Sequence, residues 1–339
     1  MSILAFVIIG VMFGAYVLSD GYDLGVAIVT PMVARNDGER AQAMHNIGPF
    51  WHANQVWLVA AGGALFALFP QAYASSLSGF YLPFMVVLWL LMYRGIAVSV
   101  RDHFANPLWH DFWDAGFVVS STLLTILFGV ALGNLVRGLP VDSHGYFVGS
   151  FSLLLNPYAL GIGAFSLVAL ALHGATFSAL RLSGPSAKRA QHAAVLLWWM
   201  VLVAYIGMSV ATWFVRLSPF EHGMWVAILP VLSIAVLVVL WLANAAGEAT
   251  KAFIASCAFL ATLVAEAAIA MFPYIVPALP GSHGLSIYDS TPSAIGLLSA
   301  LAVTIAGIAL ITFYTIIVFR RLFAAPVEAS EPLSAPRSR

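Results

Sequence analysis

The chain has 339 residues, of which 62% are hydrophobic and 8% are charged, and its formal net charge is zero. No soluble domain of this length can bury so much apolar surface, and a balanced charge lacks the basic footprint of a nucleic-acid-binding protein. The single cysteine, Cys257, excludes an internal disulfide and a thiolate metal cluster within the chain. The composition predicts an all-α membrane protein whose helices cross the bilayer many times.

Nine apolar segments follow one another along the chain, each near the roughly 20 residues that a bilayer-spanning helix needs. They cover residues 2–33, 51–69, 78–100, 112–136, 153–180, 192–216, 221–244, 251–273 and 292–320. The first lacks a basic n-region and a cleavage pattern, so we expect a retained span rather than a signal peptide. Short connections predict one integral membrane domain over residues 1–323, and the composition of 324–339 predicts a disordered cytoplasmic tail.

Lys and Arg residues are distributed unevenly between the two ends of these segments. Nine lie at one end, whereas only Arg137 and Arg216 lie at the other. The nine are Arg35, Arg40, Arg101, Arg181, Lys188, Arg189, Lys251, Arg320 and Arg321. Because cytoplasmic loops carry the excess of basic residues, the bias predicts an odd number of spans with the N-terminus outside and the C-terminus in the cytoplasm.

Ionisable side chains at membrane depth are costly, so each is a candidate functional residue. Asp20 and Asp23 lie three residues apart in the first segment and share one helix face. They fit either a proton or cation path or an ion pair with a nearby arginine, and both interpretations stay open. Glu266, in the eighth segment, has no basic neighbour in sequence and must be paired in space or protonated.

The densest polar run lies at the start of the second segment, between Trp51 and Trp57. There His52, Asn54 and Gln55 are predicted to form a hydrogen-bonded chain, and His52 titrates near neutral pH. These residues are candidates for a proton relay. The alternative is that His52 is an ordinary histidine at the membrane interface.

Two arginines lie seven residues apart on nearly the same face of the third segment, Arg94 within it and Arg101 after it. Asp114 enters the next segment from the same side. Arginines with carboxylate partners inside a bundle are as readily structural as functional, and we favour structural locking here. Asp289, in the loop before the ninth segment, is a further candidate for this polar network.

The sequence has no pattern for a cofactor bound by this chain. Two histidine pairs, His45 with His52 and His103 with His110, are seven residues apart and near helix ends, which does not suit two stacked haems. There is no Walker loop, dinucleotide-binding fingerprint or HExxH zinc motif. We therefore expect no metal site and no cofactor held by the chain itself.

Short motifs spread over most of the chain occur in the order of one known family. They are residues 20–25 (DGYDLG), 46–49 (NIGP), 51–58 (WHANQVWL), 62–67 (GGALFA), 78–81 (SGFY), Arg94, 113–114 (WD), 129–134 (GVALGN), 155–157 (LNP), 174–176 (GAT), 270–273 (AMFP) and Asp289. As a set they are specific. Through them the chain resembles subunit II of the cytochrome bd-type quinol oxidases.

The resemblance implies a heterodimer in the bacterial inner membrane that oxidises quinol and reduces dioxygen to water, an electrogenic oxidase without proton pumping. Haem b, haem d and the quinol-oxidising loop would belong to the haem-bearing subunit I. This chain would support assembly and a proton or oxygen route, with a small third subunit, membrane lipids and a structural quinone as further possible partners. The resemblance also implies two four-helix bundles and one peripheral helix, which agrees with nine predicted spans.

One departure from the family concerns the predicted relay. The family usually has Trp-Asp-Gly-Asn where this chain has residues 51–54, WHAN, so a carboxylate is replaced by His52. That carboxylate is the natural candidate for the start of a proton route in subunit II. We hypothesise that His52 replaces it functionally, with Asn54 and Gln55 orienting bound water.

Two other functions stay open on the sequence alone. One is a stand-alone secondary transporter that uses Asp20, Asp23 and Glu266 for ion coupling. Such transporters carry clear inverted repeats, whereas here residues 64–70 and 268–273 share only a faint Phe-Pro repeat. The other is a purely structural assembly subunit with no proton or oxygen path.

Overall fold

A computed structural model of the chain describes residues 1–48, 50–142, 146–216, 224–279 and 284–323. The predicted all-α fold is confirmed, since most of the described residues are helical. The named strands are β1 (Tyr274–Val276) and β2 (Leu285–Ser286), which pair antiparallel in a small ribbon. The predicted disordered tail, residues 324–339, lies outside the described residues.

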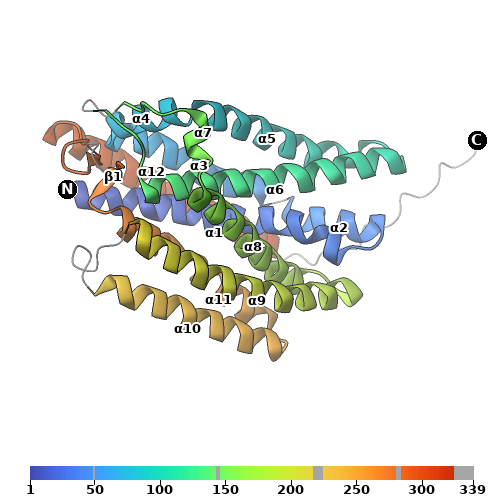
Figure 1. Ribbon diagram of the computed structural model, residues 1–339. Helices are drawn as coiled ribbons and strands as arrows, with labels where there is room; N and C mark the ends of the chain where they lie inside the picture. The colour runs from blue at the N-terminus through green and yellow to red at the C-terminus, as the bar shows by residue number, and fades with distance from the viewer. Residues whose placement is uncertain (49, 143–145, 217–223, 280–283, 324–339) are drawn as a thin grey trace, which may run out of the picture.

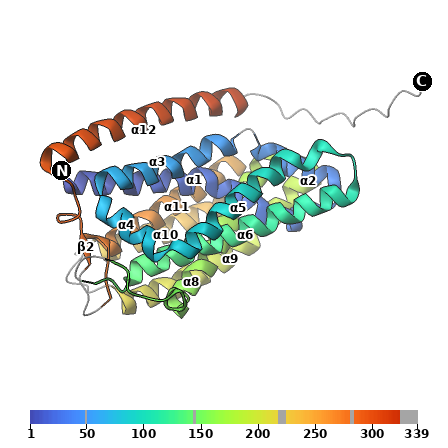
Figure 2. The same ribbon diagram turned by 90° about the horizontal axis from the view of Figure 1, so that it is seen from above.

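The long helices lie roughly along one axis (Figure 1). The helical elements are α1 (Ser2–Val33), α2 (Asp37–Ile47), α3 (Trp51–Leu68), α4 (Pro70–Gly79), α5 (Tyr81–Val100), the 3-10 turn η1 (Arg101–His103), α6 (Pro107–Arg137), α7 (Phe151–Leu154), α8 (Pro157–Arg181), α9 (Gly184–Val215), α10 (Trp225–Ala245), α11 (Ala249–Met271) and α12 (Ala294–Phe323). Figure 2 shows that α12 begins beside the N-terminal end of α1 and runs along the outside of the bundle in the same direction as α1.

Eight helices in the described part of the chain are long and apolar enough to cross a membrane. They correspond to every predicted segment except the second. That segment folds as α3, a helix of 18 residues, and the polar side chains His52, Asn54 and Gln55 at its start lower its hydropathy. The count of nine spans therefore stays a prediction.

Capping residues, rather than apolar periodicity, set several helix boundaries. The side chain of Asn106 accepts the Leu108 N–H at the start of α6, five residues before the predicted segment. The side chain of Asn156 accepts the Ala159 N–H at the start of α8, four residues after residue 153. In both helices a proline follows the cap, where its missing N–H costs nothing.

The centre of the molecule is α1, which packs against α3, α6, α8 and α11. Its crossing with α8 brings the two backbones into contact, because a Cβ placed on Gly174 would lie 2.0 Å from the carbonyl carbon of Gly25. Small residues permit this close approach of membrane helices. At the outside of the bundle α12 packs on α3. The division into two four-helix bundles and a peripheral helix stays a prediction.

Candidate functional site

Three charged side chains meet in the interior between α1 and α5. Asp20 and Asp23 come from α1 and Arg94 from α5, and each is at most 1% exposed. Arg94 donates three hydrogen bonds of 3.0 Å to Asp20, two from Nη1 and one from Nη2. The same Nη2 lies 3.9 Å from Oδ2 of Asp23. Arg94 is therefore shared unequally, and Asp20 is its main partner.

Neutral side chains complete the contacts of the two acids. The Tyr16 hydroxyl, one helical turn before Asp20, donates to Asp20 Oδ2 at 2.9 Å. The side-chain amide of Asn54, on α3, donates to Asp23 Oδ2 and to the Tyr22 hydroxyl, both at 2.8 Å. Asp20 is thus held by a guanidinium, whereas Asp23 is held mainly by a neutral amide.

The charges of this cluster balance only when one proton is bound. Two ionised carboxylates and one guanidinium would leave an excess negative charge in a buried site, which is unfavourable at low dielectric. Asp23 is the acid with the weaker pairing, and its Oδ1 has no hydrogen-bond partner among the described residues. The arrangement can therefore bind and release a proton at Asp23 while the Arg94–Asp20 pair stays intact.

Several buried polar atoms near this cluster have no protein partner within the described residues. They are Asp23 Oδ1, Asn54 Oδ1, Gln55 Nε2, Arg94 Nε, and both Nδ2 and Oδ1 of Asn46. Asn46 is close to the site because its neighbours Met44 and Ile47 share a core cluster with Tyr22 and Val26. Buried polar groups are nearly always bonded to protein or to ordered water, so we expect internal water at these atoms.

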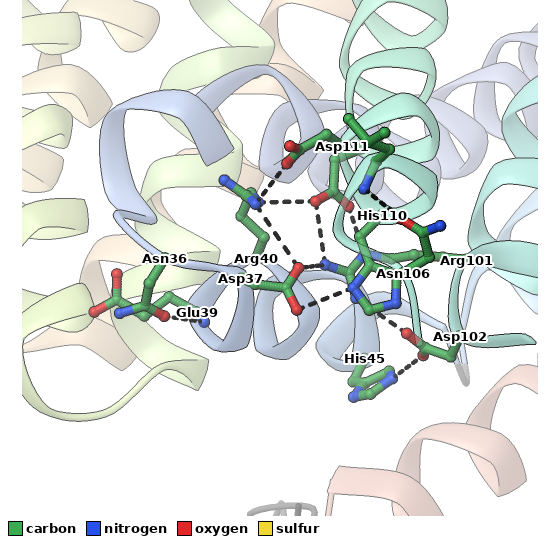
Figure 3. A network of polar contacts seen from close by, with 12 residues as sticks. Asn36, Asp37, Glu39, Arg40, His45, Arg101, Asp102, Asn106, His110 and Asp111 are labelled. Atoms are coloured by element: carbon green, nitrogen blue, oxygen red, sulfur yellow. Dashed lines mark hydrogen bonds and ion pairs between the residues drawn. The ribbon is translucent and has the colours of Figure 1, made fainter. Parts of the chain in front are cut away.

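A second network of charges lies at the end of the bundle where α2 is located (Figure 3). Arg101 forms ion pairs with Asp114 and Asp37 at 2.5 Å each and with Asp102 at 3.0 Å. Arg40 lies 2.8 Å from both Asp111 and Asp114. Arg101 thus joins η1 to Asp114 of α6 and to Asp37 of α2.

Two histidines extend this network. His45 Nε2 lies 2.7 Å from Asp102, and His110 Nδ1 lies 3.1 Å from Asp37. The four carboxylates of this network face two guanidinium groups. With both histidines protonated, the net charge of these eight residues would be zero.

The start of α2 is fixed to α9 by Glu39. Its carboxylate accepts the Arg35 backbone N–H and a hydrogen bond from Arg189, both at 2.6 Å, while its own N–H bonds to the Asn36 cap. Accepting the Arg35 N–H, with the Arg189 contact in addition, lowers the pKa of Glu39 below its usual value. We call these contacts the Glu39 clamp.

The predicted hydrogen-bonded chain from His52 through Asn54 to Gln55 is wrong. Within the described residues no hydrogen bond joins the His52 ring to either amide, and the ring is exposed and lies against Trp51, with 3.7 Å between ring centroids. Side chains two residues apart on a helix do not face each other. Asn54 therefore points to Asp23 while His52 takes a different face of α3.

The other predicted structural residues are Trp51, Trp57 and Asp289, and they do not lie together. Trp57 is buried in α3, and the Trp51 ring packs so closely over α5 that a Cβ on Gly95 would lie 3.0 Å from it. Both tryptophans thus pack beside the cluster. Asp289 is not part of the network, since its described hydrogen bonds go to Ser286 in the turn that follows β2, at 2.6 and 3.2 Å.

Glu266 lies apart from the cluster, among α9, α10 and α11. Its carboxyl group lies at hydrogen-bond distance from the hydroxyl groups of Tyr205 and Ser233. Sequence reasoning missed Tyr16 and Tyr22 as members of the site. The available signal for Tyr16 was its position four residues before Asp20, which places both on one helix face. Across the described residues no group of three His, Cys, Asp or Glu side chains is arranged to hold a metal ion.

Comparison with known proteins gives a consistent result over nearly the whole chain. A family model described as cytochrome bd terminal oxidase subunit II matches residues 1–322. The chain is 31% identical to cytochrome bd-I ubiquinol oxidase subunit 2 of Escherichia coli, over 93% of this chain and 92% of that protein. It is 32% identical to probable cytochrome oxidase subunit 2 of Haemophilus influenzae, over 94% of this chain and 93% of that protein.

A third relative is cytochrome bd ubiquinol oxidase subunit 2 of Bacillus subtilis, which is 31% identical over 91% of this chain and 90% of its own length. Among solved structures, the fold is similar to a chain of the bd oxidase from Geobacillus thermodenitrificans, with a TM-score of 0.79 at 16% identity. That match covers 95% of this chain and 98% of the other.

Proposed function

The chain belongs to the cytochrome bd terminal oxidase subunit II family, and on that premise we propose that it pairs with a haem-bearing subunit I to oxidise membrane quinol and reduce dioxygen to water. It is a multi-pass protein of the bacterial inner membrane and a non-catalytic subunit of an oxidoreductase. The alternative of a stand-alone transporter is not supported by the family match. Haem b and haem d would belong to subunit I.

Within this complex the chain would carry protons from the α2 end of the bundle towards the partner subunit. The observation that carries this proposal is the buried pair of acids sharing one guanidinium, with Asp23 Oδ1 left for water. Asn46 and Asn54 lie between the α2 end and Asp23 and carry unpartnered polar atoms of their own. Internal water bonded to these atoms would connect the surface with Asp23.

His52 would act in this route only through bound water, because no described residue bonds to its ring. It is exposed at the start of α3, two residues before Asn54. An imidazole ring can accept a proton on one nitrogen and donate one from the other. The hypothesis that it replaces the family carboxylate therefore stands, with water as a required component.

The partner subunit would cover the face of α3 and α5 beside the cluster. His52 is exposed and Gln55 is half-buried there, and Val59 and Trp89 on the same two helices are 75% and 67% exposed. A proton leaving Asp23 reaches the haem-bearing chain only if that chain lies against this part of the molecule. The excess of basic residues at the α2 end supports an orientation with that end in the cytoplasm.

An apolar groove of about 500 Å³ runs between α3 and α12 and is lined largely by small residues, among them Gly63, Ala67, Gly296, Ala300 and Gly307. Its volume falls in the range of about 300–1,000 Å³ found for small-molecule sites. This supports the proposal that a lipid or quinone tail occupies it. A small third subunit remains a prediction from the family resemblance.

The test is to purify the complex from native membranes under mild conditions and to compare Asp23→Asn with wild type. We expect a partner of similar size with bd-type haem spectra and quinol oxidase activity, and we expect Asp23→Asn to lower turnover and change its pH dependence. The matched control is Asp289→Asn, which alters an exposed turn. Unchanged turnover and pH profile in Asp23→Asn would leave assembly as the only role, and a haem-free, partnerless protein would contradict the proposal as a whole.

A further inference from the structure

A second acid at membrane depth lies in the half of the chain after residue 157, where the proposed proton route does not use it. Glu266 is on α11, five residues before its end. The Tyr205 hydroxyl of α9 donates to Glu266 Oε1 at 2.8 Å. The Ser233 hydroxyl of α10 lies 2.5 Å from the same oxygen. Ser233 is fully buried and Tyr205 is 3% exposed, while Glu266 itself is half-buried, so its carboxyl group lies among three helices.

The contacts continue from Ser233 through a second hydroxyl. Ser233 Oγ lies 2.7 Å from Oγ1 of Thr262, and Thr262 Oγ1 lies 2.7 Å from the carbonyl oxygen of Phe259. Together with the Glu266 contact this makes a row of three oxygen–oxygen contacts at hydrogen-bond distance. Each such contact needs one proton between its two oxygens.

The number of protons decides the charge of Glu266. Ser233 and Thr262 each supply a single hydroxyl proton, which is enough for two of the three contacts. The third contact needs a proton on the Glu266 carboxyl group. Glu266 then donates to Ser233, Ser233 donates to Thr262, and Thr262 donates to the carbonyl oxygen of Phe259. An ionised Glu266 would leave one of these short contacts between two oxygens without a proton.

The surrounding charges agree with a neutral carboxyl group. Within the described residues no ion pair reaches Glu266. Arg216, which follows the last residue of α9, donates to the carbonyl of Ala270 on α11 at 3.4 Å, one turn beyond Glu266. The Arg216 guanidinium lies over the Tyr274 ring. His173 of α8 contacts α11 at Ser256, ten residues before Glu266 and so about 15 Å away along the helix.

We propose that Glu266 is a protonated carboxylic acid that exchanges its proton along the Ser233–Thr262 row, as a proton-binding site independent of the Arg94–Asp20 pair. Five residues of helix separate it from the end of α11, which is about 7 Å. That end lies away from α2. The helix α10 runs towards the end of the bundle where α2 is located, and α11 begins there and runs back. The site therefore exchanges with the side of the membrane that the proposed route does not use.

Dicyclohexylcarbodiimide tests this directly, because it adds a protonated carboxyl group across a C=N bond and yields a stable acylurea without a leaving group. The intact complex is treated near neutral pH and at alkaline pH, and the labelled peptides are identified by mass spectrometry. We expect one added reagent on Glu266, in a yield that follows the protonated fraction, which falls about tenfold per pH unit once ionisation has begun. The matched control is Glu248, which is exposed and paired with Lys251 at 2.8 Å.

A second measurement covers the case in which the reagent cannot reach the site. The infrared spectrum of wild type should contain a carboxylic C=O band that is missing from Glu266→Gln and shifted in Ser233→Ala, since that change removes the acceptor of the Glu266 proton. Absence of both the label and the band would overturn the proposal. Protection from labelling by sodium ions would also overturn it, because Glu266 would then be an ionised cation ligand.

Discussion

Replacing Arg94 with leucine should reveal how strongly the buried cluster depends on its one positive charge. Arg94 donates three hydrogen bonds of 3.0 Å to Asp20 and lies 3.9 Å from Asp23, with all three side chains at most 1% exposed. Removing one partner of such a buried pair costs about 3–5 kcal/mol. The ratio of folded to unfolded protein should therefore fall by about 10²–10⁴-fold.

Removal of the acid instead, in Asp20→Leu, should reduce the free energy of unfolding by less than Arg94→Leu does. Arg94 then still has Asp23 as a partner, and a short movement would convert the 3.9 Å contact into a direct ion pair. In the double variant Asp20→Leu/Arg94→Leu no charge of the pair is left buried alone. Because apolar replacement of a whole buried pair is often neutral, most of the stability should return.

The assay is denaturant unfolding of the purified complex, followed by tryptophan fluorescence in one detergent, with quinol oxidase turnover measured on the same samples. The control is Arg320→Leu, a change at an exposed position that should alter the free energy of unfolding by less than about 0.5 kcal/mol. If Arg94→Leu is as stable as this control, or if the double variant is no more stable than Arg94→Leu, the reasoning from a buried ion pair is refuted.

Three further predictions follow from the structure. The Glu39 clamp should stabilise the protein fully above pH 4.5, the usual pKa of a glutamate, and this stabilisation should be lost as the pH falls through the lowered pKa of Glu39. Thermal stability should therefore decrease on acidification in wild type and change less in Glu39→Gln. Gly174→Ala should prevent normal assembly, because its Cβ would lie 2.0 Å from the α1 backbone, whereas Gly207→Ala, with open space around it, should assemble normally, as judged by yield of the intact complex. His52→Asp should keep oxidase turnover and its pH profile while His52→Leu should lower turnover, and equal turnover in both variants would contradict the relay.

Apolar segment length predicted the long helices well, because a bilayer needs about 20 apolar residues per span whatever the packing. The short helix α2 was not predicted. Its apolar residues Ala43, Met44 and Ile47 are buried, but charged residues occupy its first turns, so no apolar run marks it. Only the Asn36 cap with Glu39 three residues later is a local signal for its start.

The acids and the arginine of the cluster were recognised one by one, since a charge in an apolar segment stands out. An ion pair with an arginine was one of the two interpretations left open, but Arg94 was not identified as the partner, because Asp20 and Arg94 are separated by 74 positions and local spacing carries no information on such contacts. The predicted chain from His52 failed for the opposite reason. Residues adjacent in sequence were assumed to be adjacent in space, although the helix turns by about 100° per residue.

The two acids of the cluster differ in what holds them, and this difference assigns their roles. Loss of the charge on Asp20 would leave Arg94 with only the distant Asp23, so Asp20 is fixed as an ion-pair partner. Asp23 is held by the Asn54 amide, which can donate to a carboxylate or to the carbonyl oxygen of a neutral acid. It can therefore gain or lose a proton without breaking a strong pair. A relay needs a group of this kind, so within the proposed route we assign proton transfer to Asp23, while the Arg94–Asp20 pair joins α1 to α5 beside it.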